Sequence, residues 1–318
     1  MTRYLVTGGA GFIGSHLVHA LLEQGAFVRV LDNFSTGKRE NLEGLRGRFD
    51  GSRFEVQEGD VRDPAAVACA LQGVEVVFHE AAFISVPESM EKPQECFEVN
   101  VAATVSLFEA ARKVGVRRVV VASSAAVYGD SEACPLKESE PARSLSPYAA
   151  SKRADEIYAQ LYTQAFGLEA AALRYFNVYG PRQRADSMYA AAVPIFIRRL
   201  LDGKPVTVFG DGGQTRDLIN VRDVVRANLI AAEHPAAPGR VFNVCTGQET
   251  RLLDLLDVLY RLFPGAPPPV FAEPRAGDIY RSVGSPELTA QTLGFRAQVS
   301  LADGLAETVD WMKGGRNT

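Results

Sequence analysis

The sequence predicts an α/β fold in which a doubly wound parallel sheet is followed by a smaller C-terminal lobe. Short β-branched runs alternate with stretches of helical length through the first half of the chain, and such alternation is typical of parallel βαβ units. A glycine-rich turn between the first expected strand and the first expected helix supports the same fold. After Tyr175 the alternation gives way to longer polar loops, which indicates the second lobe.

Several runs of the first half are expected to be strands, with helices between them. The strands are residues 4–7, 27–31, 53–57, 74–79, 118–122 and 168–174, and the helices are residues 12–24, 65–71, 96–114 and 147–166. We therefore expect a Rossmann domain over residues 1–174, to which the chain returns around residues 215–245. Residues 175–318 are expected to form mainly the second lobe.

The composition is that of an ordinary globular protein, with 318 residues, 47% hydrophobic and 23% charged. The formal net charge of -4 argues against a nucleic-acid or anionic-membrane partner, because neutralising many phosphates requires an excess of basic residues. No apolar stretch is long and uncharged enough to predict a membrane span, and the N-terminus lacks the pattern of a signal peptide. We therefore expect a cytoplasmic protein.

The cysteines and histidines do not form a metal-binding pattern. Cys69, Cys96, Cys134 and Cys245 lie far apart, and neither a CxxC pair nor an HExxH helix occurs in the sequence. We expect reduced cysteines and no bound metal.

The glycine-rich turn has the spacing of a dinucleotide-binding site. Gly8, Gly11 and Gly14 lie directly between the first strand and the first helix. Glycines let the backbone turn tightly and approach a pyrophosphate, and the helix N-terminus offers unpaired N–H groups and a partial positive charge. We expect Gly8, Gly11, Phe12, Ile13 and Gly14 to bind this part of the cofactor.

An acidic residue at the end of the second strand indicates which dinucleotide binds. The Asp32 carboxylate is placed to accept both hydroxyls of the adenosine ribose, and it would repel a 2′-phosphate. With Asn33 beside it, Asp32 predicts NAD rather than NADP, although Lys38 and Arg39 lie nearby and soften the preference. A plain turn after the strand is the alternative interpretation of Asp32 and Asn33.

Residues after the next strands are expected to contact the same cofactor. Asp60 and Val61 follow the third strand and are placed to meet the adenine edge. Ala81 and Ala82 follow the fourth strand, where small residues permit close approach. Asn100 lies in an otherwise apolar helix. Its position fits two interpretations equally, a contact with the cofactor or a buried hydrogen-bonding group.

Tyr148 and Lys152 are the strongest catalytic candidates. Ser146 and Pro147 are a good helix start, so Tyr148 and Lys152, four residues apart, fall on one helix face. A tyrosine is a poor base at neutral pH because its ordinary pKa is about 10, but a neighbouring ammonium favours the phenolate and makes proton abstraction feasible. The lysine is also placed to reach the nicotinamide ribose.

Ser123 and Ser124 end the strand before this helix. Their hydroxyls lie at the carboxyl edge of the expected sheet, where substrate and nicotinamide should meet, so either hydroxyl is placed to hold a reacting oxygen. We assign the catalytic role to Ser124 and a substrate contact to both serines. Capping of the following turn is the alternative for either one.

These motifs together resemble one family. TGGAGFIG from Thr7, SSAAVYG from Ser123, YAASK from Tyr148 and RYFNVYGPRQ from Arg174 are similar to motifs of the extended short-chain dehydrogenase/reductases. Within that superfamily the chain looks most like the UDP-galactose and UDP-N-acetylglucosamine 4-epimerases. The resemblance spans nearly the whole chain, because GDGGQTRDLINVRDVV from Gly210 and RAGD at residues 275–278 extend it into the second lobe.

The resemblance implies an NAD-dependent enzyme that epimerises C4 of a UDP-sugar, and a second lobe that binds the nucleotide sugar. It implies Ser124, Tyr148 and Lys152 as the catalytic residues, with Tyr148, Lys152 and Tyr175 also contacting the cofactor. It further implies substrate contacts from Ser85, Asn177, Arg216, Arg275, Asp278 and Ser282. Relatives are usually homodimers that pair helices corresponding to residues 93–114 and 147–166.

The resemblance also bears on the choice of sugar. In the family a bulky tyrosine narrows the sugar pocket at the position of Ser282, so the smaller serine leaves room for a 2-acetamido group. The loop from Ser85 to Ser89 also looks like that of the N-acetyl-hexosamine epimerases. We therefore expect interconversion of UDP-GlcNAc and UDP-GalNAc, with some activity on UDP-Glc and UDP-Gal.

Sister activities remain alternatives. The 4,6-dehydratases and sugar-acid decarboxylases typically carry acidic residues after the catalytic serine, where this chain has Ala125 and Ala126. A 4-ketoreductase stays open, and so does a UDP-glucuronate 4-epimerase in which Arg182, Arg184 or Arg275 meets the sugar carboxylate. A non-catalytic NAD-sensing protein is the alternative outside the enzymes, but such proteins tend to lose the tyrosine and the lysine.

Overall fold

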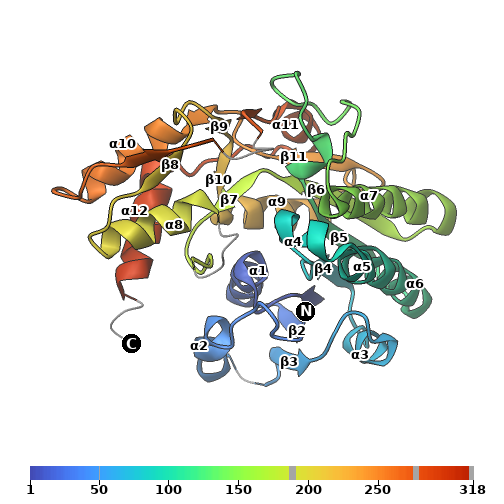
Figure 1. Ribbon diagram of the computed structural model, residues 1–318. Helices are drawn as coiled ribbons and strands as arrows, with labels where there is room; N and C mark the ends of the chain where they lie inside the picture. Colours follow the sequence, from blue (N-terminus) through green and yellow to red (C-terminus); the bar gives the residue numbers. More distant parts are fainter. Residues whose placement is uncertain (50, 186–190, 275–278, 315–318) are drawn as a thin grey trace.

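The centre of the fold is a sheet of parallel strands (Figure 1). The computed structural model describes residues 1–49, 51–185, 191–274 and 279–314. Within these ranges the seven strands of the sheet are β1 (Arg3–Thr7), β2 (Phe27–Asp32), β3 (Phe54–Glu58), β4 (Val76–His79), β5 (Arg118–Ser124), β6 (Glu169–Tyr175) and β11 (Val241–Val244). Their order is β11-β6-β5-β4-β1-β2-β3, and every neighbouring pair is parallel. The predicted fold class, a doubly wound parallel Rossmann sheet with a smaller second lobe, is confirmed.

The expected strands all form, and each differs from its predicted bounds by at most two residues. β11 is the strand that the sequence did not predict, and it comes from the part of the chain after residue 174. It pairs with β6 at one edge, with Val241 beside Ala172 and Val244 beside Tyr175. The first-half strands therefore form a sheet that the second half of the chain completes.

Helices cover both faces of the sheet. Leu5 and Val6 are adjacent in β1 and fully buried, yet they belong to different cores because successive side chains of a strand point to opposite faces. The face of Val6 is covered by α1 (Phe12–Glu23), α2 (Glu40–Arg48), α9 (Val221–Glu233) and α11 (Glu287–Leu293), and the face of Leu5 by α3 (Pro64–Ala70), α6 (Ala103–Val114) and α7 (Pro147–Phe166).

Local signals set both ends of α7. The Ser146 Oγ accepts a hydrogen bond from the Ala149 N–H at 3.1 Å, and Pro147 occupies the first turn, where no N–H is needed. Gly167 ends the helix with a φ of +73°, a backbone conformation that glycine adopts without strain. The predicted helix over residues 147–166 is therefore confirmed.

The helix predicted over residues 96–114 forms, but it begins earlier and includes a π-helical turn that the sequence did not indicate. The chain runs without a break through α5 (Pro93–Phe97), the π-helical turn (Glu98–Ala102) and α6. Asn100 lies in the π-helical turn, where its side chain accepts from the Phe83 N–H at 2.7 Å and donates to the Ser151 Oγ at 2.8 Å. Apolar periodicity does not reveal a π-helical turn, which here carries a side chain bonded to two other segments.

The second lobe has its own apolar core. Ile197, Leu259 and Leu305 are buried there between three helices, α8 (Ala192–Leu201), α10 (Leu252–Leu262) and α12 (Leu301–Gly314). Its short strands are β7 (Asn177–Tyr179) with β10 (Leu218–Asn220), β8 (Thr207–Phe209) with β13 (Val270–Ala272), and β9 (Thr215–Arg216) between β12 (Thr250–Arg251) and β14 (Arg281–Ser282). In the parts of the chain that the structure describes, no helix has the length and apolar character needed to cross a membrane.

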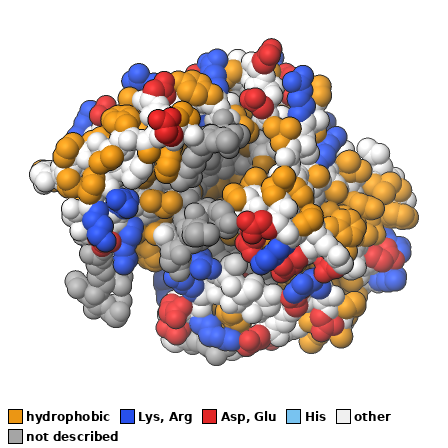
Figure 2. All heavy atoms as spheres, viewed as in Figure 1, with side chains coloured by type: hydrophobic (Ala, Val, Ile, Leu, Met, Phe, Trp, Pro, Cys, Tyr) orange, Lys and Arg blue, Asp and Glu red, His pale blue; other side chains and the backbone are white. Residues whose placement is uncertain are grey.

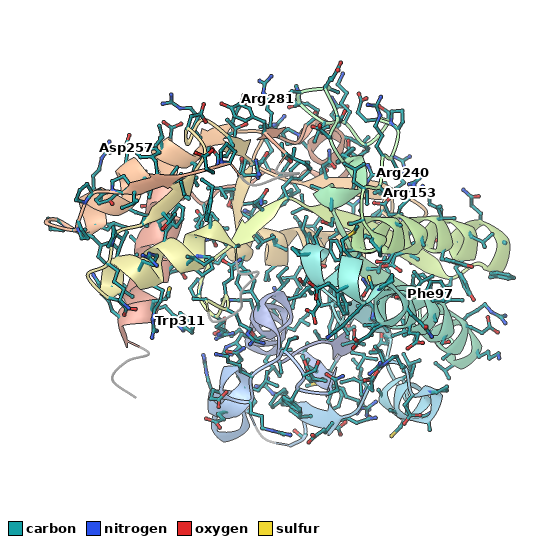
Figure 3. All side chains as sticks on the ribbon, in the orientation of Figure 1. Phe97, Arg153, Arg240, Asp257, Arg281 and Trp311 are labelled. Carbon is teal, nitrogen blue, oxygen red and sulfur yellow. The ribbon has the colours of Figure 1, made fainter. Side chains whose placement is uncertain are left out.

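Glu156 connects α7 to two strands of the sheet. Its fully buried carboxylate accepts from the Arg174 Nε on β6 at 2.6 Å and from the Ser123 hydroxyl at the end of β5 at 2.7 Å. Arg153, labelled on the same helix in Figure 3, donates to the second oxygen of the Glu156 carboxylate at 2.8 Å. These bonds from Glu156 hold α7 in place against the sheet. Removing Glu156 would leave the buried Arg174 charge without compensation.

We expect Glu156→Gln to lower the free energy of unfolding by about 3 kcal/mol, because the buried Arg174 guanidinium loses its counter-charge. Urea denaturation of the purified protein measures this loss. Glu109→Gln is the control, since Glu109 pairs with Arg112 on the outer surface of α6, and exposed ion pairs contribute little. Equal losses in the two variants would contradict the role given to Glu156.

Candidate active site

The glycine-rich turn has no room for side chains. Gly8 has a φ of +67°, and a Cβ atom added there would lie 2.7 Å from the backbone nitrogen of Ala81. A Cβ atom on Gly14 would overlap the carbonyl oxygen of Gly8. Gly11 is the N-cap of α1 and brings no side chain to the first N–H groups of the helix, so these groups are available to a pyrophosphate.

A cavity of about 530 Å³ begins at this turn. Its lining includes the predicted cofactor residues Gly8, Gly11, Phe12, Ile13, Gly14, Asp32, Asn33, Asp60, Val61, Ala81 and Ala82. We call it the cofactor cavity. The glycines and the helix N–H groups fit the pyrophosphate of NAD. The carboxylate at the end of β2 fits the adenosine ribose.

Asp32 is buried at the end of β2, and backbone groups hold both of its carboxylate oxygens. The Ala10 N–H donates to Oδ2 at 2.8 Å and the Phe34 N–H donates to Oδ1 at 2.7 Å. Burial raises the pKa of the Asp32 carboxyl, and these two N–H groups act against that rise. Each oxygen keeps a second lone pair, so the carboxylate remains able to accept the two ribose hydroxyls.

Asn33 and Asp60 are bonded to each other in the next part of the wall. The Asn33 Nδ2 donates to the Asp60 Oδ2 at 2.8 Å. Hydrogen bonds from the Arg62 guanidinium hold the pKa of the Asp60 carboxyl well below its usual range. The Asp60 carboxylate is therefore ionised at neutral pH and already paired.

A second cavity, of about 680 Å³, adjoins the cofactor cavity and extends into the second lobe. The predicted residues Ser123, Ser124, Tyr148, Tyr175, Asn177 and Arg216 all line it. We call it the substrate cavity. Ile13, Ile84, Val178 and Gln183 line both cavities, and Figure 2 shows the molecule hollowed between its two lobes. The structure thus brings the predicted catalytic and nucleotide-contacting groups together.

Tyr148 faces the substrate cavity, and Lys152 lies one helical turn further along α7 in the interior. The Lys152 Nζ donates to the Ala122 O at 2.9 Å and to the Asp155 Oδ2 at 3.2 Å. Burial acts against the ammonium, but Asp155, Tyr148 and Glu80 outweigh it and raise the pKa of Lys152. Lys152 therefore stays positively charged near Tyr148, as the predicted role of Tyr148 as a base requires.

The two serines of the substrate cavity are bonded differently. The Ser123 hydroxyl donates a hydrogen bond to the Glu156 carboxylate. The Ser124 Oγ instead accepts from the Ala126 N–H at 3.1 Å, and within the described parts of the chain no acceptor takes its proton. Ser124 is therefore the serine whose hydroxyl is available to hold a ligand oxygen.

Tyr175 has a protein partner for its hydroxyl, and that partner is a residue which sequence reasoning missed. The Tyr175 OH donates to the Glu80 Oε1 at 2.7 Å and accepts from the Asn228 Nδ2 at 2.8 Å. Burial raises the pKa of the Glu80 carboxyl to about 7 and that of Tyr175 well above its usual range. Glu80 lines the cofactor cavity and is the first residue after β4. That position at the carboxyl end of a strand is the sequence signal that could have identified it as a site residue.

Asn100 is part of the wall behind the cofactor cavity. Its amide accepts from the Phe83 N–H and donates to the Phe83 O, and the described lining of the two cavities does not include it. The structure shows Asn100 as a buried hydrogen-bonding group, and its contact with the cofactor stays a prediction.

Some predicted substrate contacts lie elsewhere. Ser85 caps the short helix α4 (Val86–Glu91) and lines the cofactor cavity instead of the substrate cavity. Ser282 lies on β14 beside Arg216 of β9, outside the described lining of both cavities. Arg275 and Asp278 fall outside the residues that the structure describes.

Sequence reasoning also missed residues of the substrate cavity that the second lobe contributes. Gln214 lies two residues before Arg216, inside a motif already recognised, so a signal existed. Arg199 lines the cavity from α8, and its Nε donates to the Pro205 O at 2.5 Å. Arg198 and Arg199 are adjacent in the last turn of α8, and the sequence gives no local indication that Arg199 faces a ligand.

A Rossmann sheet, a glycine-rich turn with an acid at the end of β2, and a Tyr–Lys pair at an adjoining cavity define an NAD-dependent enzyme of the extended short-chain dehydrogenase/reductase type. The chain belongs to the NAD dependent epimerase/dehydratase family, whose model matches residues 4–245. The family resemblance and NAD as the cofactor, both predicted from the sequence, are confirmed.

Similar proteins cover the chain almost completely. The UDP-glucose 4-epimerase of Mycolicibacterium smegmatis is 42% identical over 313 residues, 98% of each chain. The structure of Thermus thermophilus UDP-glucose 4-epimerase with NAD is 41% identical, with a TM-score of 0.87 over 98% of this chain and 99% of that one. The UDP-N-acetylglucosamine 4-epimerase of Methanobrevibacter ruminantium, in complex with UDP-N-acetylmuramic acid, is 36% identical, with a TM-score of 0.93 over 99% of both. A dTDP-glucose 4,6-dehydratase and a UDP-glucuronic acid 4-epimerase also match, so the comparisons establish the family and not the sugar.

We expect Gly14→Ala to weaken NAD binding about tenfold or more, because its Cβ would displace the turn that meets the pyrophosphate. Calorimetric titration of NAD into cofactor-free protein measures the change. Gly44→Ala is the matched control, since a Cβ atom there has no atom within 4 Å and alanine favours helix α2. An unchanged affinity in the Gly14 variant would show that the cofactor binds elsewhere.

Proposed function

We propose that this protein catalyses the NAD-dependent epimerisation of a UDP-sugar at C4 through a transient 4-keto sugar. The lining of the substrate cavity carries the proposal. Tyr148 and Ser124 supply a proton acceptor and a hydroxyl donor at the edge of the sheet, and no Asp or Glu occurs among the described lining residues. Epimerisation needs proton transfer at one oxygen, whereas dehydration needs further acid and base groups for C5–H and the 6-hydroxyl.

Each side chain has a defined part in this reaction. NAD, when bound, supplies a reversible acceptor for the C4 hydride. Tyr148 takes the O4 proton with the help of the Lys152 charge, and the Ser124 hydroxyl holds O4. Asn177 and Arg216 hold the nucleotide diphosphate while the keto sugar turns its opposite face, and Tyr148 then returns the proton. The configuration at C4 inverts with no net oxidation.

The preferred substrates in this proposal are UDP-GlcNAc and UDP-GalNAc, with some activity on UDP-Glc and UDP-Gal. Similarity to the M. ruminantium enzyme supports the first pair, and similarity to the M. smegmatis enzyme supports the second. Ser282 lies outside the described lining, so its small size gives no support to an acetamido group. The small side chains of Ser123, Ala191 and Ala192 in the cavity wall support it instead.

UDP-glucuronate 4-epimerisation is the main alternative among the sugars. A sugar carboxylate needs a cationic partner, but Arg182 and Arg184 line a separate groove with Lys38 and not the substrate cavity. The Arg182 Nη1 donates instead to the Ser15 Oγ on α1 at 3.3 Å. Neither arginine is therefore placed to meet a sugar carboxylate in the substrate cavity, and Arg275, the third predicted partner, falls outside the described residues.

The test is NMR of the sugar anomeric signals when the purified protein meets UDP-GlcNAc, UDP-Glc or UDP-glucuronate, with and without added NAD. Formation of the C4 epimer, fastest with UDP-GlcNAc, is the expected result. A stable 4-keto product, release of carbon dioxide or a requirement for NADH would overturn epimerisation in favour of a dehydratase, decarboxylase or ketoreductase. Binding of NAD without turnover of any of these sugars would instead point to a sensor.

We expect Tyr148→Phe to lower kcat by about a hundredfold to ten-thousandfold while NAD remains bound, because it removes the proton acceptor and little volume. Tyr158→Phe makes the same change on the same helix away from both cavities, and it should keep wild-type activity. Turnover of the fastest sugar and calorimetry with NAD measure the two effects. Retention of activity by the Tyr148 variant would refute its role as the base.

We also propose that two copies of the chain pair through α5 and α7. Large apolar side chains are exposed on these neighbouring helices: Phe97 is 56% exposed, Ile157 49%, Leu161 43% and Phe166 51%. Figure 2 shows apolar side chains gathered over this part of the molecule, and Figure 3 shows Phe97 on it. The same helices of a second copy, related by a twofold axis, would cover this surface and form a symmetric dimer.

We expect Leu161→Lys to shift the protein toward the monomer. In a twofold interface the same apolar surface of each subunit faces the other, so the new lysines of both subunits would be buried in it. Sedimentation velocity across a concentration series measures the change. Trp311→Lys, an equally exposed position on α12 of the other lobe, is the control and should sediment like the wild type. A wild-type protein that is monomeric at high concentration would exclude the dimer.

A further inference from the structure

Lys152 is buried almost completely, and the protein determines where its ammonium points. The residue is 3% exposed, and its Nζ donates to the Ala122 carbonyl at the end of β5 and to the Asp155 carboxylate one turn along α7. An ammonium has three donor hydrogens, so these two bonds leave one for a ligand. A buried cation is stable only if a counter-charge accompanies it.

Asp155 is the carboxylate that accompanies Lys152. It is 1% exposed, its Oδ2 lies 3.2 Å from the Lys152 Nζ, and its Oδ1 has no hydrogen-bond partner within the described parts of the chain. Burial raises the pKa of Asp155, and Lys152 acts against that rise. The Thr104 hydroxyl also lowers the pKa of Asp155, but the contact with Lys152 has the larger effect.

The other ionisable groups near this pair do not replace Asp155. They are Tyr148 and Glu156 on α7, His79 at the end of β4, Glu80 after it, and Cys96 on α5. Burial lowers the pKa of His79 to about 3, so the imidazole is neutral between the Thr7 and Thr104 hydroxyls. Burial also raises the pKa of the Cys96 thiol, which stays protonated.

The remaining carboxylates near the pair have partners of their own. Glu156 pairs with Arg174, and Glu80 accepts from the Tyr175 hydroxyl. In the described residues, Asp155 is thus the one carboxylate within ion-pairing distance of Lys152. The charge of the lysine depends on it more than on any other group.

We propose that Asp155 is a positioning residue of the active site, which holds the Lys152 ammonium against the end of β5 through a buried ion pair. The inference rests on the proposed function, in which Lys152 assists Tyr148. Asp155 itself touches neither cavity and transfers no proton to the substrate. It sets the orientation and the charge of a residue that does assist the transfer.

The sign of the effect follows from the forces on Lys152. Burial lowers the pKa of Lys152, and Asp155 is the largest of the contributions that raise it. Asp155→Asn keeps the shape of the side chain and removes its charge, so burial prevails and the pKa falls. The ammonium of the variant therefore loses its proton at a lower pH than that of the wild type, and the alkaline limb of kcat/KM moves to lower pH.

Lysine NMR of the holoenzyme tests this without any sugar. The chain has seven lysines, so side-chain isotope labelling gives few signals, and loss of one in Lys152→Met assigns Lys152. In the wild type Lys152 should remain protonated over the pH range in which the protein is folded. In Asp155→Asn its titration should move to lower pH by about one unit or more. Identical titrations in the two proteins would overturn the proposal.

A control separates positioning from a purely structural role. Glu156→Gln removes the neighbouring buried carboxylate, which pairs with Arg174, so it should lower stability and leave the Lys152 titration in place. An Asp155→Asn protein that loses stability but titrates like the wild type would likewise make Asp155 only structural. Because the readout is the lysine itself, failure of this inference is distinct from failure of the proposed reaction, which the sugar NMR decides.

A double variant keeps the test decisive if Asp155→Asn does not fold. Asp155→Asn combined with Lys152→Met removes both charges, so no buried ammonium is left without a counter-charge and the double variant should fold where Asp155→Asn alone does not. A double variant that fails to fold, although Lys152→Met alone folds, would show that Asp155 acts independently of the lysine, and the proposal would fall.

Discussion

The parallel direction of the seven described strands of the sheet is the constraint on which the rest of the structure depends. Parallel strands end at the same edge, so Asp32, Ala81 and Ser124 come together although they are far apart in the sequence. The second lobe follows β6 at this edge and supplies the facing wall. One directional rule thus places the proposed cofactor residues, the proposed proton acceptor and the proposed nucleotide contacts around two adjoining cavities.

Helix α7 meets this edge with two buried carboxylates in succession, and the two have different partners. Asp155 lies against Lys152, whereas Glu156 lies against Arg174 and the Ser123 hydroxyl. Adjacent residues of a helix point in different directions. Asp155 therefore supplies the counter-charge for Lys152, while Glu156 holds the helix to the sheet. The roles proposed for Asp155 and Glu156 make stability and chemistry separable by single substitutions on α7.

Much of the arrangement could be predicted because its signals are local. The glycine turn at Gly8 and the Ser146–Pro147 helix start are complete within a few residues, and strand alternation is readable in each run. Asn100 and Ser282 could not be placed, since their surroundings depend on which distant segments fold against them. Asp155 follows Lys152 at a spacing that is common on exposed helices, and only the packing of α7 on the sheet buries the pair.

The partition shared by the two cavities has a consequence for how such a protein diversifies. Ile13, Ile84, Val178 and Gln183 belong to both walls, and they come from α1, the segment after β4, and the chain that follows β6. A side chain exchanged there to admit a different sugar also reshapes the surroundings of the dinucleotide. New substrate ranges are therefore reached more freely through the outer walls, which the second lobe supplies alone, than through this inner partition.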